Sequence, residues 1–434
     1  MRGWIRPFYH GAIGAARAAS ALAPAGGGKL QQTFHARRMA LASLQRQAAQ
    51  QRQAGHPLAW FHAPSVGEGL QARPVAQALR GMRPDVQQAY THFSPSAERL
   101  AAGMGADVTG YLPWDGVAEA EALLTALRPS VLAFVKLDVW PHLVERATRR
   151  QRPVVLLSAT LSPRSGRQGW WARQLLGDAY RALAGVGAID ARDAERLVAL
   201  GVRRDVIRVT GDTGFDQAWE RSRRANRAGP LLAPLADGRP TVVAGSTWPA
   251  DEAHLLPAWE QLRKAVPDAR LVIAPHEPTA AHLAPVLAWA REAGVRAHTL
   301  AAVEAGGRDT AAEADVVVVD RVGVLWELYA LATAAYVGGG FHAAGLHSVI
   351  EPAVFGAPVL FGPRHHTSRE AGLLLGGGGG AVAADQGALT ATLRQWLTDA
   401  DTRLAAGLAA SALVEAERGA TQRTLALLTP FLPG

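Results

Sequence analysis

Short apolar runs alternate with amphipathic stretches along most of this 434-residue chain. The runs have the length of buried strands and the stretches between them have helical periodicity, so the pattern predicts parallel sheets covered by helices. The alternation stops at a polar, proline-containing break at 221–239 and then restarts. The runs are 58–63, 86–92, 131–135, 154–157, 186–189 and 206–209 before the break, and 241–244, 270–274, 316–319, 335–337 and 358–361 after it.

Two such series predict an α/β protein with two Rossmann-like domains. The chain is longer than one core usually serves, and we expect domains at 55–220 and 240–434, with 221–239 as their linker and 1–54 as a helical N-terminal segment. Ligands of these sheets bind beyond the carboxyl ends of the strands, which predicts a site in a cleft between the domains. The run Gly376–Gly380 is interpreted as a flexible loop without chemistry.

Several function classes are excluded by what the sequence lacks. There is no cysteine, so disulfide frameworks, thiolate metal sites and cysteine nucleophiles are ruled out. The motifs H-E-x-x-H, G-x-S-x-G and the Walker glycine–lysine loop are absent, which argues against a metalloprotease, a serine hydrolase and a P-loop enzyme. A dehydrogenase is disfavoured because no G-x-G-x-x-G opens the first βα unit.

The positive charge of the chain is concentrated at its N-terminus. The formal net charge is +8, and no acidic residue precedes Glu68, so the remaining basic and acidic groups balance. An anionic partner is therefore expected, either nucleic acid or a lipid surface. The basic residues of this segment are Arg2, Arg6, Arg17, Lys29, Arg37, Arg38, Arg46 and Arg52.

Residues 4–23 favour the lipid surface. The aromatic residues Trp4, Phe8 and Tyr9 lie among arginines, as in an interfacial helix, and too few strongly apolar residues are present for a membrane-spanning helix. An ordinary solvated helix is the alternative interpretation. The aromatic–basic interleaving typical of single-strand nucleic-acid binding is absent, so we predict an anionic membrane partner and no nucleic acid.

The first motif, at 62–69, follows the first strand and leads into a helix. Gly67 permits a tight turn, and Glu68 falls at the helix start, where the helix dipole favours a carboxylate. A carboxylate in such a turn can act as a general base toward a hydroxyl. A helix-capping glutamate is the competing interpretation. His62 and Ser65 belong to the same motif.

Three motifs of the second series point to phosphate and nucleotide binding. Gly245-Ser246-Thr247 presents hydroxyl and N–H groups near a helix start, either for phosphate or as a simple cap. His276 follows the next strand, where a lone histidine is often structural. Gly338–Gly340 ends a strand, where a ligand can approach the backbone closely. The helix that opens near His347 and Ser348 aims N–H groups at an anion, and Glu351 can accept both hydroxyls of a ribose. A plain glycine-rich turn remains the alternative.

At this point the chain resembles the 3-deoxy-D-manno-octulosonic acid (Kdo) transferases of lipopolysaccharide assembly over about residues 30–400. The elements occur in the family's order and are specific as a set. His62–Glu68 resembles H-x-x-S-V-G-E, and Leu112–Asp115 resembles L-P-x-D. The others are Leu157–Ser162 with Arg164 and Ser165 (N-A-R-L-S-x-R-S), Gly211–Asp216 (G-N-x-K-F-D), Asp320–Leu325 with Leu328 and Tyr329 (D-x-x-G-E-L-x-x-L-Y, including Gly323), and Gly338–Glu351 (G-G-S … G-G-H-N-x-x-E).

Several positions depart from the family pattern. Lys136-Leu137-Asp138 stands where the family has E-x-E, and Pro275-His276-Glu277 stands in place of P-R-H. Gly214 replaces a lysine, and Ser348 replaces the asparagine after the loop histidine.

The resemblance implies a two-domain GT-B glycosyltransferase on the cytoplasmic face of the inner membrane. It implies CMP-Kdo as donor, a lipid A precursor as acceptor, inversion of configuration, no bound metal and no cofactor. Glu68 would be the base, with His62, Ser65, Gly67, Lys136 and Asp138 on the acceptor side. The expected donor-side residues are Ser246, Thr247, His276, Gly323, Gly339, Gly340, His347, Ser348 and Glu351.

Two other functions are weighed against this one. Another GT-B transferase could use a UDP-sugar and a different membrane acceptor, with the same fold and loop. A lapsed, lipid-binding scaffold is the second, against which the retention of Glu68 and Glu351 argues.

Overall fold

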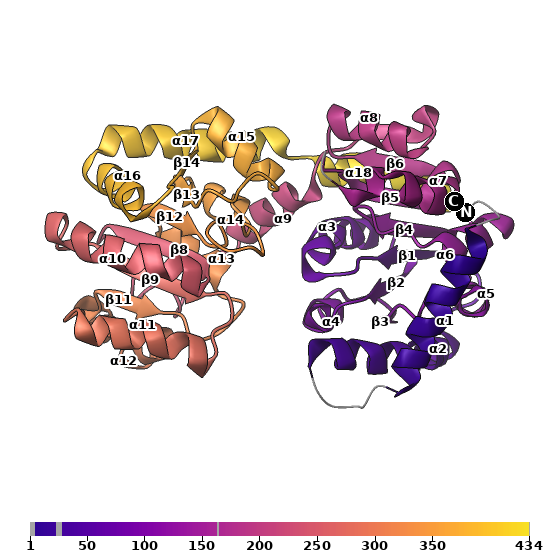
Figure 1. Cartoon of the computed structure of the whole chain (residues 1–434), viewed down its shortest axis with the longest axis horizontal. Helices are drawn as coiled ribbons and strands as arrows, with labels where there is room; N and C mark the ends of the chain where they lie inside the picture. The colour runs from indigo at the N-terminus through magenta and orange to yellow at the C-terminus, as the bar shows by residue number, and fades with distance from the viewer. Residues whose placement is uncertain (1–4, 23–27, 163–164, 434) are drawn as a thin grey trace. The chain divides into compact units, whose positions relative to one another are not determined.

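The computed structural model describes residues 5–22, 28–162 and 165–433, and the chain divides into two compact units (Figure 1). Unit 1 comprises Met1–Gln217 and Arg418–Gly434, and unit 2 comprises Ala218–Glu417. Arg2, Trp4 and Arg164, which the sequence analysis singled out, lie outside the described residues.

Unit 1 is built on a parallel sheet of seven strands in the order β3-β2-β1-β4-β5-β6-β7. The strands are β1 (Leu58–His62), β2 (Gln87–His92), β3 (Val108–Tyr111), β4 (Val131–Val135), β5 (Val154–Ala159), β6 (Gly185–Ala188) and β7 (Ile207–Val209). The helices are α1 (Arg6–Leu22), α2 (Lys29–Gln51), α3 (Val66–Met82), α4 (Glu98–Ala102), α5 (Val117–Leu127), α6 (Pro141–Arg149), α7 (Trp170–Arg181), α8 (Ala191–Leu200) and α18 (Ala420–Leu428), while α9 (Thr213–Ser222) continues into unit 2.

Unit 2 repeats the architecture with the strand order β10-β11-β9-β8-β12-β13-β14. Its strands are β8 (Thr241–Thr247), β9 (Arg270–Pro275), β10 (Ala297–Thr299), β11 (Val316–Val318), β12 (Ala334–Val337), β13 (Val359–Phe361) and β14 (Gly380–Val382). Its helices are α10 (Pro249–Ala265), α11 (Ala280–Glu292), α12 (Leu300–Glu313), α13 (Leu325–Leu328), α14 (Ile350–Ala353), α15 (Arg369–Gly377), α16 (Gln386–Thr398) and α17 (Ala400–Glu417). The predicted fold class, two Rossmann-like α/β units, is confirmed.

Continuous apolar strands are the reason for this architecture. Successive side chains of a strand point to opposite faces, and both faces are buried here. Trp60 and Phe134 lie in the apolar core on one face of the unit 1 sheet, whereas Phe61 and Ala133 lie in the core on the other. Such two-sided burial is typical of parallel sheets. Helices therefore have to cover both faces.

Three strands were not predicted from the sequence: β3, β10 and β14. Each is an edge strand of its sheet, and each has at least two residues that are not fully buried. The interpretation of Gly376–Gly380 as a flexible loop is wrong. Gly376 and Gly377 end α15, Gly378 forms its left-handed cap at φ 78°, and Gly380 begins β14. Glycine provides the positive φ that this helix end requires.

The N-terminal helices are an integral part of unit 1. Along the edge strand β3, the Gln47 amide donates to the carbonyl of Thr109 at 2.9 Å and accepts from its N–H at 3.0 Å, as a neighbouring strand would. Arg6 pairs with Glu145 at 3.0 Å, and Arg17 pairs with Glu119 at 3.0 Å. Part of the predicted positive charge is therefore neutralised within the protein.

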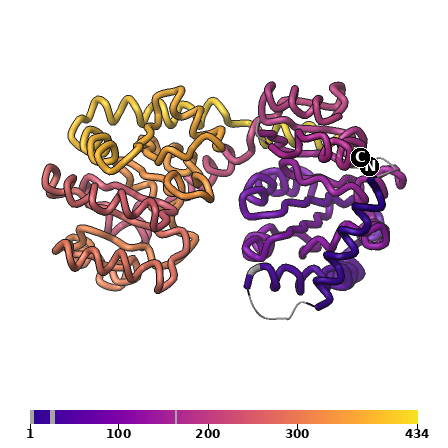
Figure 2. The backbone as a smooth tube through the Cα atoms, viewed as in Figure 1, coloured from indigo at the N-terminus to yellow at the C-terminus, as the bar shows by residue number. Residues whose placement is uncertain are grey.

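The end of the chain also belongs to unit 1, although the sequence pattern assigned it to the second domain. Residues 418–434 return to unit 1, as the backbone trace shows (Figure 2). Asp216 accepts hydrogen bonds from the backbone N–H groups of Gly419, at 2.8 Å, and Thr421 at the start of α18. Leu425 and Leu428 are buried in the unit 1 core. The predicted linker also contributes to a core, because Leu232 and Leu235 are buried in unit 2.

Candidate active site

The candidate residues of unit 1 gather where the strand order of the sheet changes direction. The chain proceeds from β1 outward to β2 and β3 and then returns to β4, which pairs directly with β1. Ligands of open α/β sheets bind at the carboxyl ends of the strands at such a switch point. The motif of Glu68 follows β1, and Lys136 and Asp138 follow β4. The topology therefore brings these two sequence motifs together.

Glu68 lies in the first turn of α3 and is held by two side chains. The ammonium of Lys136 lies 3.3 Å from its Oε1, and the Ser65 hydroxyl donates to its Oε2. About 19% of the Glu68 side chain and 36% of the Lys136 side chain remain exposed. A carboxylate that is oriented and still open to solvent can take a proton from a hydroxyl. Gly67, beside it, is exposed.

His62 and Asp138 form a second, more buried pair. Nε2 of His62 lies 3.3 Å from Oδ2 of Asp138, which also accepts from the Trp140 indole N–H at 3.0 Å. A carboxylate can only accept, so Nε2 of His62 carries a proton, and Nδ1 of the same ring lies 3.0 Å from the Thr91 hydroxyl. Burial raises the pKa of Asp138, but the hydrogen bonds from His62 and Trp140 and the nearby charge of Arg167 outweigh it, so the pKa lies below its usual value. The His62–Asp138 pair therefore holds the Asp138 carboxylate, as an anion, in the segment that follows β4.

Arg37, which the sequence analysis counted only among the basic N-terminal residues that meet an anionic partner, is buried and supports the segment that follows β4. Arg37 of α2 is 1% exposed, and its guanidinium lies 3.8 Å from the ring centre of Trp114 and 5.0 Å from that of Trp140. It donates to the carbonyl of Pro113 at 2.9 Å. A cation over tryptophan rings away from water is a favourable contact. The N-terminal helix thereby orders the segment that carries Asp138.

Asp115 ties the same loop to α1. It accepts from the backbone N–H groups of His142 and Leu143 at the start of α6, both at 2.9 Å, and from the Tyr9 hydroxyl at 2.8 Å. Burial raises the pKa of Asp115 to about 6, against these hydrogen bonds. Tyr9, which was expected to face lipid, therefore points into the protein.

The candidate residues of unit 2 gather at the corresponding switch point, between β8 and β12. Their glycine loop is organised by Asp251 of α10, which is fully buried and which the sequence analysis missed. Asp251 accepts from the Tyr336 hydroxyl at 2.9 Å and from the backbone N–H groups of Gly339, at 2.8 Å, and Phe341, at 3.2 Å. Its position at the third residue of a helix, a capping position, is the signal that could have identified it.

The glycines of this loop are required by neighbouring backbone. A Cβ on Gly340 would lie 2.3 Å from the N atom of Gly362, and Gly339 has φ +91°. Both positions therefore exclude larger residues even without a ligand. His347 and Ser348 follow on the same loop, half-buried and exposed respectively.

Glu351 is paired within unit 2. Its Oε1 lies 3.1 Å from Nη1 of Arg221, and both side chains keep 24% exposure. The Arg221 guanidinium also lies 4.9 Å from the ring centre of Trp326. Burial raises the pKa of Glu351, and the charge of Arg221 opposes this shift. Arg221 was not predicted, because no sequence signal links it to a residue so far along the chain.

The other predicted donor-side residues differ in their burial and in their hydrogen bonding. Ser246 is half-buried with φ 54°, and Gly323 is exposed after β11. Thr247 is 1% exposed and donates its hydroxyl to Glu252 at 2.8 Å, so this hydroxyl is engaged inside the protein. His276 is half-buried beside the ring of Trp248.

Strained backbone marks both switch points. Lys136 after β4 has φ 61°, and Ser246 at the end of β8 has φ 54°. Non-glycine residues rarely adopt this left-handed conformation, and such strain clusters at functional sites. Both residues belong to the predicted set.

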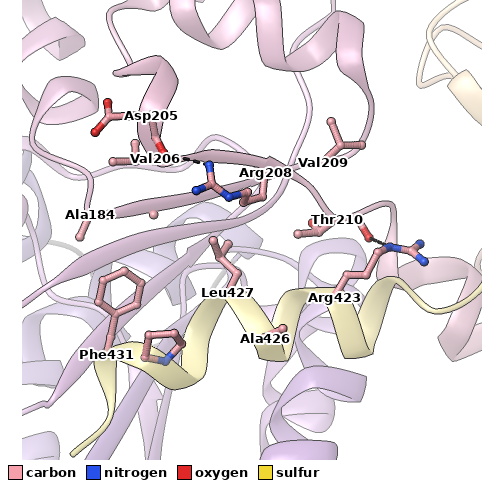
Figure 3. Close-up of a pocket in the computed structure, with 12 residues that line it drawn as sticks. Ala184, Asp205, Val206, Arg208, Val209, Thr210, Arg423, Ala426, Leu427 and Phe431 are labelled. Atoms are coloured by element: carbon pink, nitrogen blue, oxygen red, sulfur yellow. Dashed lines mark hydrogen bonds between the residues drawn. The ribbon is translucent and has the colours of Figure 1, made fainter.

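A cavity of about 510 Å³ lies elsewhere in unit 1, beside β7 and α18 (Figure 3). Arg208 and Arg423 line it, but Arg208 donates to the carbonyl of Asp205 and Arg423 to that of Thr210, both at 2.9 Å. None of the predicted site residues lines this cavity. We assign it no role in the reaction.

The described residues offer neither a metal-ion site nor a membrane-spanning helix. Within the part of the chain that the structure describes, no group of three or more histidine, aspartate or glutamate side chains is arranged to hold a metal ion. None of the helices described is long and apolar enough to cross a bilayer.

Known proteins match this chain along most of its length. Residues 35–217 match the family model of the 3-deoxy-D-manno-octulosonic-acid transferases. The 3-deoxy-D-manno-octulosonic acid transferase of Bordetella pertussis is 31% identical, covering 86% of this chain and 87% of the relative, and that of Haemophilus influenzae is 26% identical, with coverage of 86% and 87%. The UDP-GlcNAc 2-epimerase of Neisseria meningitidis, solved with UDP-GlcNAc, shares the fold at a TM-score of 0.60 and 14% identity, covering 86% of this chain and all of that one.

Proposed function

This chain belongs to the 3-deoxy-D-manno-octulosonic acid (Kdo) transferase family, and we propose that it transfers Kdo from CMP-Kdo to a hydroxyl of a lipid A precursor. The observation that carries the proposal is the similarity to Kdo transferases across both units. The positions of Glu68 and Glu351, at the carboxyl ends of the two sheets, support it.

Glu68 acts as the general base in this proposal. Its carboxylate takes the proton of the acceptor hydroxyl, whose oxygen forms a bond to the anomeric carbon of Kdo. The bond from that carbon to the CMP phosphate oxygen breaks, and CMP leaves with the electron pair. One displacement inverts the configuration and needs no redox cofactor. General-base assistance of this kind contributes about 10²–10⁴-fold to a rate.

Unit 2 holds the nucleotide in this proposal. The loop from Gly339 and Gly340 to His347 and Ser348 supplies backbone and side-chain donors for the phosphate. Glu351 accepts the ribose hydroxyls, and its contact with Arg221 at 3.1 Å keeps the carboxylate oriented. Charge-assisted hydrogen bonds of this kind are stronger than neutral ones.

We propose further that unit 1 rests on an anionic membrane surface through its N-terminal helices. Phe8 and Leu22 of α1 are 73% and 86% exposed, and Leu30 of α2 is 67% exposed. Exposed apolar side chains next to basic residues suit the interface of a bilayer. Because Arg6 and Arg17 pair with glutamates, apolar contacts contribute more to this attachment than the charge count suggests.

The test is product formation with defined donors. Purified protein is incubated with lipid IVA and either CMP-Kdo or a UDP-sugar, with and without EDTA, and the lipid product is weighed by mass spectrometry. We expect a mass gain of Kdo with CMP-Kdo alone, unchanged by EDTA. Turnover of a UDP-sugar instead would indicate another GT-B transferase. Lipid binding without turnover of either donor would indicate a lapsed scaffold.

A further inference from the structure

Three imidazole rings and one indole ring stack at the carboxyl end of the unit 2 sheet. Trp248 follows β8, His276 follows β9, and His342 and His347 lie in the loop after β12. The Trp248 ring centre lies 4.2 Å from that of His342, at an interplanar angle of 5°, and 4.5 Å from that of His276, at 23°. His347 stacks on His276 at 4.6 Å. The rings therefore hold one another in place.

One hydrogen bond within this stack determines a protonation state. The indole N–H of Trp248 lies 3.2 Å from Nε2 of His347. An indole N–H can only donate, so Nε2 of His347 has to be an unprotonated acceptor. A neutral imidazole then carries its proton on Nδ1.

The surroundings keep the His347 ring neutral. Burial, with the neighbouring His276 and His342 acting in the same direction, lowers the pKa of His347 to about 4. Asp251 is the carboxylate that favours the charged ring. Its oxygens already accept from Tyr336, Gly339, Phe341 and the backbone N–H of Trp248.

The remaining donor of the ring has no acceptor of its own. Nδ1 of His347 makes no hydrogen bond to any residue that the structure describes. The residue lies on the loop that, in the proposed function, holds the nucleotide. We propose that Trp248 is a positioning residue that locks His347 in the Nδ1–H tautomer, so that the ring gives one uncharged hydrogen bond to the phosphate of CMP.

This inference rests on the proposed function and adds to it the tautomer in which His347 contacts the phosphate. A free histidine side chain favours the Nε2–H form, so the Nδ1–H form requires a donor at Nε2. This chain has His276 where the family pattern has arginine. An imidazole ring rather than a guanidinium therefore lies beside His347. Phosphate recognition in this chain then relies on an oriented neutral donor.

The experiment reads the tautomer directly. Nitrogen-15 NMR of the histidine rings in the full-length protein at pH 7.5, with the His347 signals assigned from His347→Gln, distinguishes the two forms. Trp248→Phe keeps an aromatic ring and removes the N–H. Trp289→Phe is the matched control, because the Trp289 indole donates to Glu260 in the same unit and touches no histidine of the stack.

We expect Nδ1–H for His347 in the wild type and in Trp289→Phe, and a shift toward Nε2–H in Trp248→Phe. CMP affinity by calorimetry should fall about two- to tenfold in Trp248→Phe and in His347→Gln, the effect of one hydrogen bond, and stay unchanged in Trp289→Phe. An Nε2–H or protonated His347 in the wild type would overturn the tautomer assignment.

The two halves of the proposal fail separately. The Nδ1–H form together with unchanged CMP affinity in both His347→Gln and Trp248→Phe would overturn the phosphate contact. Absence of CMP binding by the wild type would overturn the donor site of the proposed function, and the phosphate contact with it, while the NMR result would still decide the tautomer.

Discussion

The ammonium of Lys136 lies 3.3 Å from Oε1 of Glu68, across the switch point of the unit 1 sheet. One residue follows β4 and the other follows β1, so the contact depends on the pairing of these two strands. Lys136 occupies a position where the resembling family has a glutamate. The proposed base therefore faces a cation in this chain, which orients it.

Replacing Lys136 by methionine should lower kcat only slightly. The lysine is partly exposed, and ion pairs of this kind contribute about 0.2–1 kcal/mol. We therefore expect Lys136→Met to reduce kcat by about two- to fivefold, with unchanged CMP affinity, in steady-state assays with lipid IVA. A loss as large as that of removing the Glu68 carboxylate would show that Lys136 touches the reacting groups itself.

Removing the Glu351 carboxylate should weaken nucleotide binding. Hydrogen bonds to a charged group contribute about 1.5–3 kcal/mol, so Glu351→Ala should bind CMP about ten- to hundredfold more weakly by calorimetry. Vesicle flotation should stay as in the wild type. Glu417→Ala is the control, because Glu417 also pairs with an arginine, Arg369 at 3.2 Å, within unit 2. Equal CMP affinity of Glu351→Ala and Glu417→Ala would show that Glu351 has only a structural role.

The apolar surface of the N-terminal helices should govern membrane attachment. The double variant Phe8→Ser with Leu22→Ser changes two exposed side chains and should leave the fold intact, whereas deleting residues 1–28 would also remove the Tyr9–Asp115 hydrogen bond. We expect vesicle affinity to fall at least tenfold, because each buried apolar side chain contributes about 1.5–3 kcal/mol and about 1.4 kcal/mol is already tenfold. Leu404→Ser with Leu408→Ser, on α17, is the matched control. Equal flotation of the two double variants would exclude α1 as the attachment site and make nucleic acid the next partner to test.

His142 should make unit 1 sensitive to acid. Burial lowers the pKa of His142 to about 4. Neither ring nitrogen has a hydrogen-bond partner among the described residues. Below the ordinary value of 6.5 the unfolded chain binds a proton that the folded chain excludes, so the free energy of unfolding should fall by about 3 kcal/mol between pH 6.5 and pH 4. His142→Phe should reduce this fall in denaturant titrations. The same fall in His142→Phe as in the exposed control His366→Phe would contradict the assignment.

The inner strands could be predicted from the sequence because burial on both faces makes them continuously apolar. The edge strands β3, β10 and β14 could not, because their side chains are more polar or smaller, whereas the edge strand β7 was expected at 206–209 from its apolar residues. Gln47 illustrates the difficulty: its amide completes the hydrogen bonding of β3 from a helix that lies far away in the sequence.

The candidate site was predictable where a motif directly follows a strand, as with Glu68 and Glu351. The residues that hold those motifs were not. Arg37 contacts Trp140 and Arg221 contacts Glu351 only because the topology brings distant segments together. Asp251 carried a local helix-capping signal, but its contacts to the glycine loop became visible only in the structure.

The turnover of Glu68→Gln shows most directly whether Glu68 is the base. The amide keeps the shape of the side chain and can still contact Ser65, but it cannot take the acceptor proton. Glu195→Gln, which alters an exposed ion pair with Arg204 at 2.5 Å in the same unit, is the control. With CMP-Kdo and lipid IVA, we predict that Glu68→Gln loses about 10²–10⁴-fold in kcat, while its CMP affinity and the kcat of Glu195→Gln stay as in the wild type. Near-normal turnover by Glu68→Gln would contradict the assignment of the base.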